Sequence, residues 1–344
     1  MTTETDAPAI QERVGHYYKA DRTYRVGQEK VREYARAVQD YHPAHWDDEA
    51  AAALGYSGLV APLTFTSIPA MAANQKLLEE VVVGYDTYVQ TEQVFEQHRP
   101  IVVGDELLTD VELSSVRRIA GRDMITITNT FVDTAGETVH TMHTTVVGVT
   151  ADEVDPAITT AVRKVMMHDV DVLAADAAVT DYVKTVRPAG EQQRISDGGQ
   201  TRAPRSCAFE TLSVGDQLPE RHLLLSRGDL VNYAGVAGDA NPIHWDESIA
   251  KLAGLPDVIA HGMLTLGLGA GFVASWSGDP GAVSKYAVRL SAPAIVPADE
   301  RGDIEFSGRI KSLDPDTRDG VVIVGAKSAG KKIFGMATMK IRFA

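Results

Sequence analysis

The stretch Gly238–Trp276, GDANPIHWDESIAKLAGLPDVIAHGMLTLGLGAGFVASW, decides the fold of this 344-residue chain. It places the carboxylate of Asp239 and the imidazole of His244 five residues apart in a turn that contains Pro242. Proline fixes its own φ and holds the preceding residue extended, so this turn is stiff. His261 follows, just before an apolar helix rich in small residues. We therefore expect a rigidly held acid–base pair beside the start of a helix.

A weaker copy of this stretch lies in the first half, at Gln39–Ser67: QDYHPAHWDDEAAAALGYSGLVAPLTFTS. The two copies align without a gap at an offset of 199 residues, the separation of Asp40 and Asp239. At that offset identical residues meet at many positions, among them Tyr34 with Tyr233, Ala35 with Ala234, Pro43 with Pro242, His45 with His244, Trp46 with Trp245, Asp47 with Asp246, Gly55 with Gly254 and Thr66 with Thr265. Such a repeat predicts two copies of one fold.

Each half begins with helical patterns and continues with strand patterns. Apolar residues at helical spacing in 26–38 and small residues in 49–54 predict two helices, and Pro62 is expected in the first turn of a third. From about residue 85, and again from 286, segments rich in Val, Ile and Thr predict antiparallel strands. This is an α+β pattern in which a sheet wraps around a helix. We expect one domain at 1–150, a linker at 151–205 and a second domain at 206–344.

Bulk composition excludes several classes of function. The chain is 44% hydrophobic and 23% charged, as in globular proteins, and no run approaches the ~18 apolar residues of a membrane-spanning helix. The N-terminus lacks the apolar centre of a signal peptide, so a cytoplasmic location is expected. A net charge of −14 argues against nucleic acid as a partner. The single cysteine, Cys207, excludes an intrachain disulfide and a cysteine metal cluster.

The residues of the central stretch suit proton transfer next to a polarised carbonyl. A carboxyl and an imidazole are a natural pair for taking a proton from one atom and giving one to its neighbour. The alternative is that Asp239 and Asn241 cap local backbone and His244 is a turn residue. The N–H groups at a helix start near Gly262 would polarise a substrate carbonyl, and glycine lets that carbonyl approach. His261 either orients the loop or simply caps and packs.

Two further motifs have the residue types, but not the geometry, of a cofactor site and a metal site. Gly267, Gly269 and Gly271 lack the spacing G-x-G-x-x-G because Phe272 holds the last position, so they indicate close helix packing and no nicotinamide or flavin cofactor. His140 and His143 have a helical metal-ligand spacing. Their segment predicts a strand, where residues three apart face opposite sides. We therefore expect no cofactor and no metal site.

These motifs resemble a known family. A Gly-Asp-x-Asn-Pro-Ile-His turn followed by Ala-His-Gly-Met is similar to the MaoC-like (R)-specific hydratases and dehydratases, whose hotdog fold wraps an antiparallel sheet around a long helix. The second half resembles the catalytic subunit HadB of the (3R)-hydroxyacyl-ACP dehydratase, and the first half resembles its partner HadA. The resemblance implies a double hotdog in which the two domains pair within one chain.

The resemblance also implies a reaction and a set of site residues. The reaction is loss of water from a (3R)-3-hydroxyacyl thioester to give the trans-2-enoyl thioester, in fatty acid elongation of long-chain or mycolate type. The catalytic pair falls on Asp239 and His244, with either one as the acid and the other as the base. The N–H of Gly262 falls on the oxyanion donor, and Asn241 and His261 belong to the substrate-binding motif.

The first copy departs from the motif, since Pro62-Leu63 replace His261-Gly262. Proline has no N–H to offer and leucine is bulky, so this half is expected to be non-catalytic. By the resemblance it instead shapes a tunnel for the acyl chain with Leu59, Phe65 and Ile68.

Other functions remain open at this point. The alternatives are an (R)-specific enoyl-CoA hydratase, a hotdog thioesterase and a non-catalytic acyl-binding protein. The expected partner is an acyl thioester on acyl carrier protein or coenzyme A, and the fold leaves room for a homo-oligomer.

Overall fold

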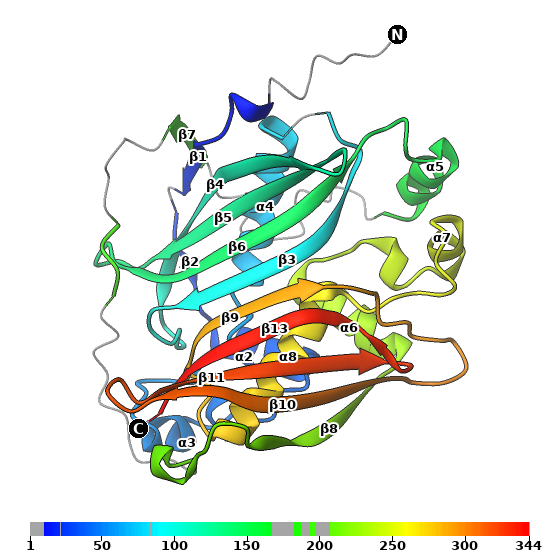
Figure 1. The fold of residues 1–344 in the computed structure, drawn as a ribbon. Helices are drawn as coiled ribbons and strands as arrows, with labels where there is room; N and C mark the ends of the chain where they lie inside the picture. Colours follow the sequence, from blue (N-terminus) through cyan, green and yellow to red (C-terminus); the bar gives the residue numbers. More distant parts are fainter. Residues whose placement is uncertain are drawn as a thin grey trace.

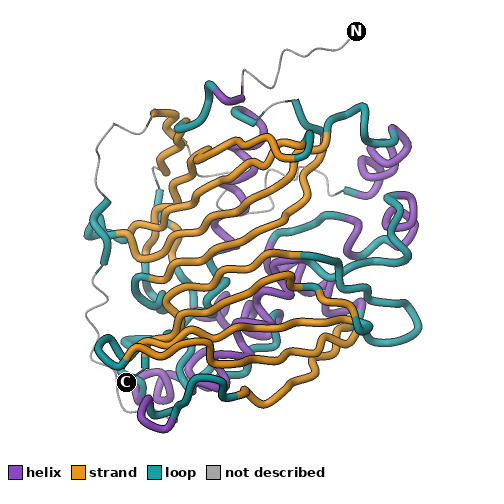
Figure 2. Tube along the Cα trace, in the orientation of Figure 1, coloured by secondary structure: helices purple, strands orange, loops and turns teal. Residues whose placement is uncertain are grey.

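The strands of the two halves form one sheet in this computed structural model, which describes residues 10–20, 22–82, 84–166, 182–186, 193–196 and 207–343. Within these residues the sheet has 13 strands (Figures 1 and 2). Those of the first half and the segment after it are β1 (His16–Ala20), β2 (Tyr24–Arg25), β3 (Thr87–Gln97), β4 (Glu106–Ile119), β5 (Arg122–Val132), β6 (Thr138–Val149) and β7 (Tyr182–Val186). Those of the second half are β8 (Gln217–Leu225), β9 (Val283–Leu290), β10 (Gly302–Asp314), β11 (Asp319–Ser328), β12 (Lys331–Lys332) and β13 (Phe334–Arg342).

Several helices lie against one face of this sheet (Figure 1). The α-helices are α2 (Gln28–Ala37), α3 (Asp48–Ala53), α4 (Ser67–Glu80), α5 (Pro156–Val165), α6 (Arg227–Ala237), α7 (Glu247–Leu252) and α8 (Gly262–Ser277). Short 3₁₀ helices lie at η1 (Pro43–His45), η3 (Phe209–Thr211) and η4 (Pro242–His244). None of the helices in the described residues is long and apolar enough to span a membrane.

The two halves repeat one topology. The first half orders its main strands β1-β4-β5-β6-β3, and the second orders them β8-β10-β11-β13-β9. If the five main strands of each half are numbered in chain order, both halves have the same spatial order: first, third, fourth, fifth, second. The turns repeat as well, because η1 and α3 lie 199 residues before η4 and α7. The expected α+β double hotdog is therefore the architecture observed.

The halves join at β3 and β9, the second strand of each. These strands pair antiparallel from Glu92 opposite Arg289 to Glu96 opposite Lys285. Both end pairs are ion pairs, with Arg289 Nη2 2.8 Å from Glu92 Oε1 and Lys285 Nζ 2.7 Å from Glu96 Oε1. Between them the rings of Phe95 and Tyr286 stack with centroids 6.1 Å apart. Neither half therefore has a free edge at this boundary.

Helix α8 packs on both halves through its glycines. A Cβ added at Gly267 would lie 2.5 Å from Val38 Cγ1, in the first half, and one at Gly271 would lie 3.1 Å from Asp40 Cγ. One added at Gly269, on the opposite side, would lie 2.7 Å from the hydroxyl of Tyr286 in the helix's own sheet. The three glycines therefore serve close packing, as their spacing predicted.

The core crosses the same boundary. One cluster of buried apolar side chains contains residues of both halves, including Tyr34 and its repeat partner Tyr233, whose ring centroids are 6.2 Å apart. Leu59, Phe65 and Ile68 belong to it. A second cluster packs α4 on β4 and β5.

Most expected elements form. Strands β1, β2 and β8, and β7 in the segment expected to link the domains, lie where no strand was expected. The prediction that Pro62 lies in the first turn of a helix is wrong, because α4 begins at Ser67 and residues 63–66 form a turn. Part of the linker is helical, as α5. The domain boundaries and the cytoplasmic location stay predictions, and residues 167–181, 187–192 and 197–206 of the expected linker lie outside the described residues.

The surroundings of two helical glycines predict opposite effects of alanine substitution on thermal stability. Gly267→Ala should lower the melting temperature, because its Cβ would also lie 2.9 Å from Val38 Cβ, an atom too close to the backbone to swing away. Overpacking of this kind costs about 1–3 kcal/mol. Gly235→Ala in α6 has nothing within 4 Å and should raise stability by up to about 1 kcal/mol. Thermal unfolding checks both, and equal shifts would contradict the packing described.

Candidate active site

The central stretch forms a turn between three helices. Helix α6 ends at Gly238, whose φ of 78° is the left-handed conformation that glycine adopts most easily. Asp239 follows, and its Oδ1 accepts a hydrogen bond from Asn241 N at 3.3 Å. Asn241 then caps η4 by accepting from Ile243 N at 3.3 Å. Asp239 and Asn241 therefore do cap local backbone, as the alternative to a catalytic role expected. The same hydrogen bonds also fix where Asp239 and His244 lie.

His244 is held as a neutral imidazole, and within the part of the chain that the structure describes its Nε2 has no hydrogen-bond partner. Its side chain is 7% exposed, and Nδ1 lies 2.8 Å from the carbonyl oxygen of Ile259. Burial lowers the pKa of His244 and outweighs the nearby Asp239, which raises it. The carbonyl can only accept, so Nδ1 carries the proton and Nε2 keeps its lone pair. His244 is thus equipped to accept a proton at Nε2.

His261 connects the other two groups. Its ring is fully buried, stacks on His244 with centroids 3.8 Å apart, and lies 4.9 Å from the ring of Tyr233. Its Nε2 lies 3.2 Å from the backbone oxygen of Asp239. Burial, then the neighbouring His244, lowers the pKa of His261 to about 2, so it is neutral and donates from Nε2 to that carbonyl. His261 therefore contacts the backbone of the turn and also packs on its neighbours, and its role in the reaction stays a prediction.

Asp239 completes a three-residue cluster. It is half-buried, and ligand atoms of Asp239, His244 and His261 lie within 4.8 Å of one another. Three such groups could suggest a metal. The two imidazoles are, however, nearly parallel, at 27°, so their in-plane lone pairs do not converge on one point. The arrangement fits an acid–base pair better than a metal centre.

Gly262 opens α8 directly beside this cluster, with His261 as its N-cap residue. The N–H groups of a first helical turn have no partner within the helix and lie at the positive end of its dipole. A Cβ at Gly262 would lie 3.1 Å from Gln90 Oε1 and 3.2 Å from Leu290 Cδ1. Glycine therefore allows one side chain from each half of the sheet to approach the start of α8 closely.

The other predicted binding residues lie in different surroundings. Asn241 is exposed, and Leu59, Phe65 and Ile68 are buried in the shared core. Their contacts with substrate stay predictions. His140 and His143 lie on β6, as expected. His140 is buried beside Phe95 and Phe131, with centroids 6.0 and 5.8 Å away, whereas His143 contacts Thr128 Oγ1 at 2.9 Å on the other side.

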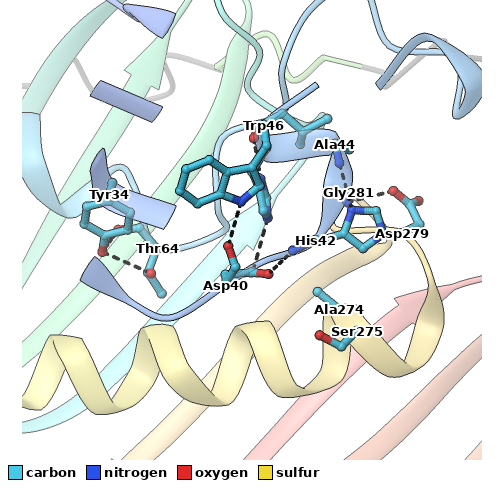
Figure 3. A network of polar contacts seen from close by, with 12 residues as sticks. Tyr34, Asp40, His42, Ala44, Trp46, Thr64, Ala274, Ser275, Asp279 and Gly281 are labelled. Carbon is cyan, nitrogen blue, oxygen red and sulfur yellow. Dashed lines mark hydrogen bonds and ion pairs between the residues drawn. The ribbon is translucent and has the colours of Figure 1, made fainter. Parts of the chain in front are cut away.

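The equivalent pair of the first half is closed. His45 Nε2 lies 3.1 Å from Asp40 Oδ2, and the two side chains are 0% and 3% exposed. Figure 3 shows Asp40 directly above α8, within a network that includes His42 and Trp46. Burial alone would raise the pKa of Asp40 and lower that of His45, but their mutual attraction outweighs it and shifts both pKa values the other way. This is a structural ion pair with no room for a ligand between its partners.

The helix start also differs between the halves. Gly262 aligns with Leu63 at the repeat offset, yet α4 begins at Ser67, four residues later. The first half therefore lacks a helix N-terminus at the aligned position. Pro62 fits this difference, because the backbone around it forms a turn in which Phe65 N donates to Pro62 O at 2.9 Å.

Three contributors to the site were not predicted: the ring of Tyr233, the carbonyl of Ile259 and the side chain of Gln90. The repeat did align Tyr233 with Tyr34, which could have marked it as a structural residue. The carbonyl of Ile259 carries no side-chain signal. Gln90 comes from the other half of the chain, and no motif marks it.

Matches to known proteins cover parts of both halves of the chain. The model of the "FAS1-like, dehydratase domain region" matches residues 12–142, and that of the "MaoC like domain" matches residues 211–328. A solved structure described as a MaoC-like dehydratase is 69% identical, with a TM-score of 0.90, and the match covers 98% of this chain and 100% of that one. The chain belongs to the MaoC-like dehydratase family. It is accordingly a hydratase or dehydratase, a hydro-lyase.

Two further proteins resemble this MaoC-like protein, one in part of its sequence and one in its fold. A UPF0336 protein of Saccharopolyspora erythraea is 38% identical over 142 residues, which are 41% of this chain and 91% of that protein. The conserved hypothetical protein Rv0216 of Mycobacterium tuberculosis, described as having a double hotdog fold, is 14% identical with a TM-score of 0.59, and 96% of each chain is covered. The latter likeness concerns the fold alone.

The closed pair of this MaoC-like protein predicts a specific dependence of stability on pH. The lowered pKa of Asp40 stabilises the fold above about pH 3.9, and the raised pKa of His45 stabilises it below about pH 6.5. The full contribution lies between these values. It is lost as the pH rises through the raised pKa of His45, or falls through the lowered pKa of Asp40.

Thermal unfolding of wild type and His45→Gln between pH 5 and pH 9 measures this contribution. The wild-type advantage should shrink as the pH rises above about 6.5. Asp40→Ala should cost about 1–3 kcal/mol at pH 6, since it leaves Nε2 of the buried His45 ring without its partner. A wild-type advantage that stays constant over the whole range would refute the ion pair.

Proposed function

We propose that this chain is a (3R)-3-hydroxyacyl thioester dehydratase whose active site is the Asp239, His244 and Gly262 cluster of the second half. One observation carries the proposal. Of the two copies, only the second combines three features in one place: a neutral, partly accessible imidazole at His244, a carboxylate at Asp239 that is not locked in a buried ion pair, and the start of a helix at Gly262. Three groups of this kind match the three needs of the reaction: a base, an acid and a donor to the thioester carbonyl.

The proposed steps follow from the geometry. The substrate carbonyl accepts from the N–H of Gly262, which acidifies the neighbouring Cα–H and stabilises the negative charge that develops on oxygen. His244 Nε2 takes the Cα proton. Asp239 gives a proton to the 3-hydroxyl, which leaves as water as the Cα–Cβ double bond forms. Hydration of the enoyl thioester is the same sequence reversed.

In this proposal the first half supports the site without turning over substrate. Its ion pair is closed at 3.1 Å, and its helix begins four residues after the aligned position. Leu59, Phe65 and Ile68, in the core between the halves, are suitably apolar to shape an acyl tunnel. Fatty acid elongation of long-chain or mycolate type is the corresponding pathway, and acyl carrier protein the favoured carrier.

A substrate series tests the function. The protein is incubated with trans-2-enoyl thioesters of increasing chain length, on coenzyme A and on acyl carrier protein, and the loss of the enoyl absorbance is followed. Preference for the carrier separates a dehydratase of elongation from an enoyl-CoA hydratase. Release of free thiol would indicate a thioesterase instead, and binding without turnover an acyl-binding protein.

Substitution of the proposed pair should abolish most activity. We expect Asp239→Asn and His244→Ala each to lower kcat by about 10²-fold or more, since each removes a positioned acid or base. A matched control is the exposed contact of His222 Nδ1 with Asp303 Oδ2, at 2.9 Å on the sheet. His222→Ala and Asp303→Asn should leave kcat unchanged. Rates within a few-fold of wild type for both site variants would rule out this assignment.

The pH profile of Asp239→Asn should show which residue is the base. Loss of the carboxylate removes a charge that raises the pKa of His244, so this pKa should fall further below about 6.5. If His244 is the base, the residual dehydration rate rises with pH through that single pKa and then stays level. A rate that instead declines with increasing pH would make His244 the acid.

A further inference from the structure

Gln90 is a polar residue of the first half that lies at the site of the second. It stands on β3, whose pairing with β9 runs from Glu92 to Glu96, so Gln90 lies just beyond the end of this pairing. The register of β3 against β6 shifts between Gln90 and Glu92, which marks a β-bulge at Thr91. Bulges redirect side chains and often occur next to active sites.

The side chain of Gln90 lies over the first residue of α8. Its Oε1 is 3.1 Å from the position of a Cβ on Gly262, and Leu290 flanks the same position from β9. Its Nε2 donates to Gln93 Oε1 at 2.9 Å and contacts Met263 Sδ at 3.6 Å. Gln93 is itself fully buried.

This network fixes which end of the amide faces the site. Gln93 Nε2 donates to the carbonyl oxygen of Val94 at 3.4 Å, so Gln93 Oε1 is the acceptor at the contact with Gln90, and Nε2 is the only donor in the Gln90 side chain. Among the described residues, both hydrogen bonds of the Gln90 side chain are donated by Nε2. Gln90 is half-buried, and Oε1 therefore remains an acceptor beside the N–H groups of α8.

A donor and an acceptor placed together recognise a ligand that offers the reverse pair. An acyl thioester on a pantetheine arm does so, because the amide N–H of its cysteamine unit lies within roughly 6 Å of the thioester carbonyl oxygen, as judged from ordinary bond lengths. Both carriers considered above share this unit. The acyl group alone offers its 3-hydroxyl as the competing donor.

We propose that Gln90 Oε1 accepts a hydrogen bond from this amide N–H while the carbonyl is bound at Gly262. The proposal rests on the proposed function and adds to it. The first half then recognises the carrier arm and positions the thioester for chemistry in the second half. Gln90 is a substrate-binding residue in this scheme and takes no part in proton transfer.

Three crotonyl thioesters test this contact: those of coenzyme A, of N-acetylcysteamine, which keeps the amide N–H, and of propanethiol, which lacks it. Gln90→Ala should lower kcat/KM by about 3- to 10-fold on the first two, the range expected for one neutral hydrogen bond, and by less than about 2-fold on the third. Gln90→Leu, which has a similar volume without an acceptor, should do the same. Val89→Ala, on the same strand with its side chain 54% exposed, is the control and should change nothing.

Binding of the saturated butyryl thioesters of the same three thiols separates this proposal from the proposed function, because these compounds cannot react. Wild type should bind the two amide-containing compounds more tightly than Gln90→Ala does, with no such difference for the propanethiol ester. Equal losses on all three would mean that Gln90 contacts the acyl group or supports the fold, and no loss on any would overturn the contact. Failure of the enzyme to turn over any enoyl thioester would instead refute the proposed function and leave the binding result decisive for Gln90.

Discussion

The antiparallel pairing of β3 with β9 is the interaction on which the rest of the molecule depends. It fuses two five-stranded units of identical strand order into one sheet and leaves no edge between them. Its register matters more than its ion pairs, since exposed pairs of this kind contribute only about 0–1 kcal/mol each. A slip by one residue would turn Phe95 and Tyr286 out of the core and carry Gln90 away from α8. The geometry of the candidate site is therefore set partly by strand pairing between the halves.

Helix α8 shows how the two halves share one structural element. Its glycines allow contact with the first half at Gly267 and Gly271 and with its own sheet at Gly269. The first residue of the same helix, Gly262, allows Gln90 and Leu290 to approach the helix start closely. A helix held from both sides keeps its N-terminal N–H groups in place, and fixed donors are what stabilisation of developing charge requires. The cost is low helix propensity, which the surrounding packing offsets.

The sequence could predict what depends on local pattern and repetition. The strands rich in Val, Ile and Thr, the short helices and both turns follow from period and spacing, and an ungapped offset showed that the halves share one fold. Strand β8, QLPERHLLL, was missed because charged residues interrupt it, and β1 because its five residues acquire their pairing only from distant strands.

The state of each Asp–His pair could not be predicted either. Asp40 and His45 have the same spacing as Asp239 and His244, yet only the first pair closes, with Gly271 of α8 packed against it. Gln90 likewise reaches the site through a bulge and an interdomain register. Such features arise from contacts between segments far apart in the chain, which residue spacing does not encode.

The late start of α4 limits how far a few substitutions could make the two halves alike. Exchanging Pro62-Leu63 for the His-Gly of the other half would give the first half the same residues at these two positions. It would not create a helix N-terminus there, because the backbone through residue 66 is a turn. Nor would it separate Asp40 from His45 beside α8. The halves differ in backbone as well as in side chains, so exchanging these two residues would not give the first half the site geometry of the second.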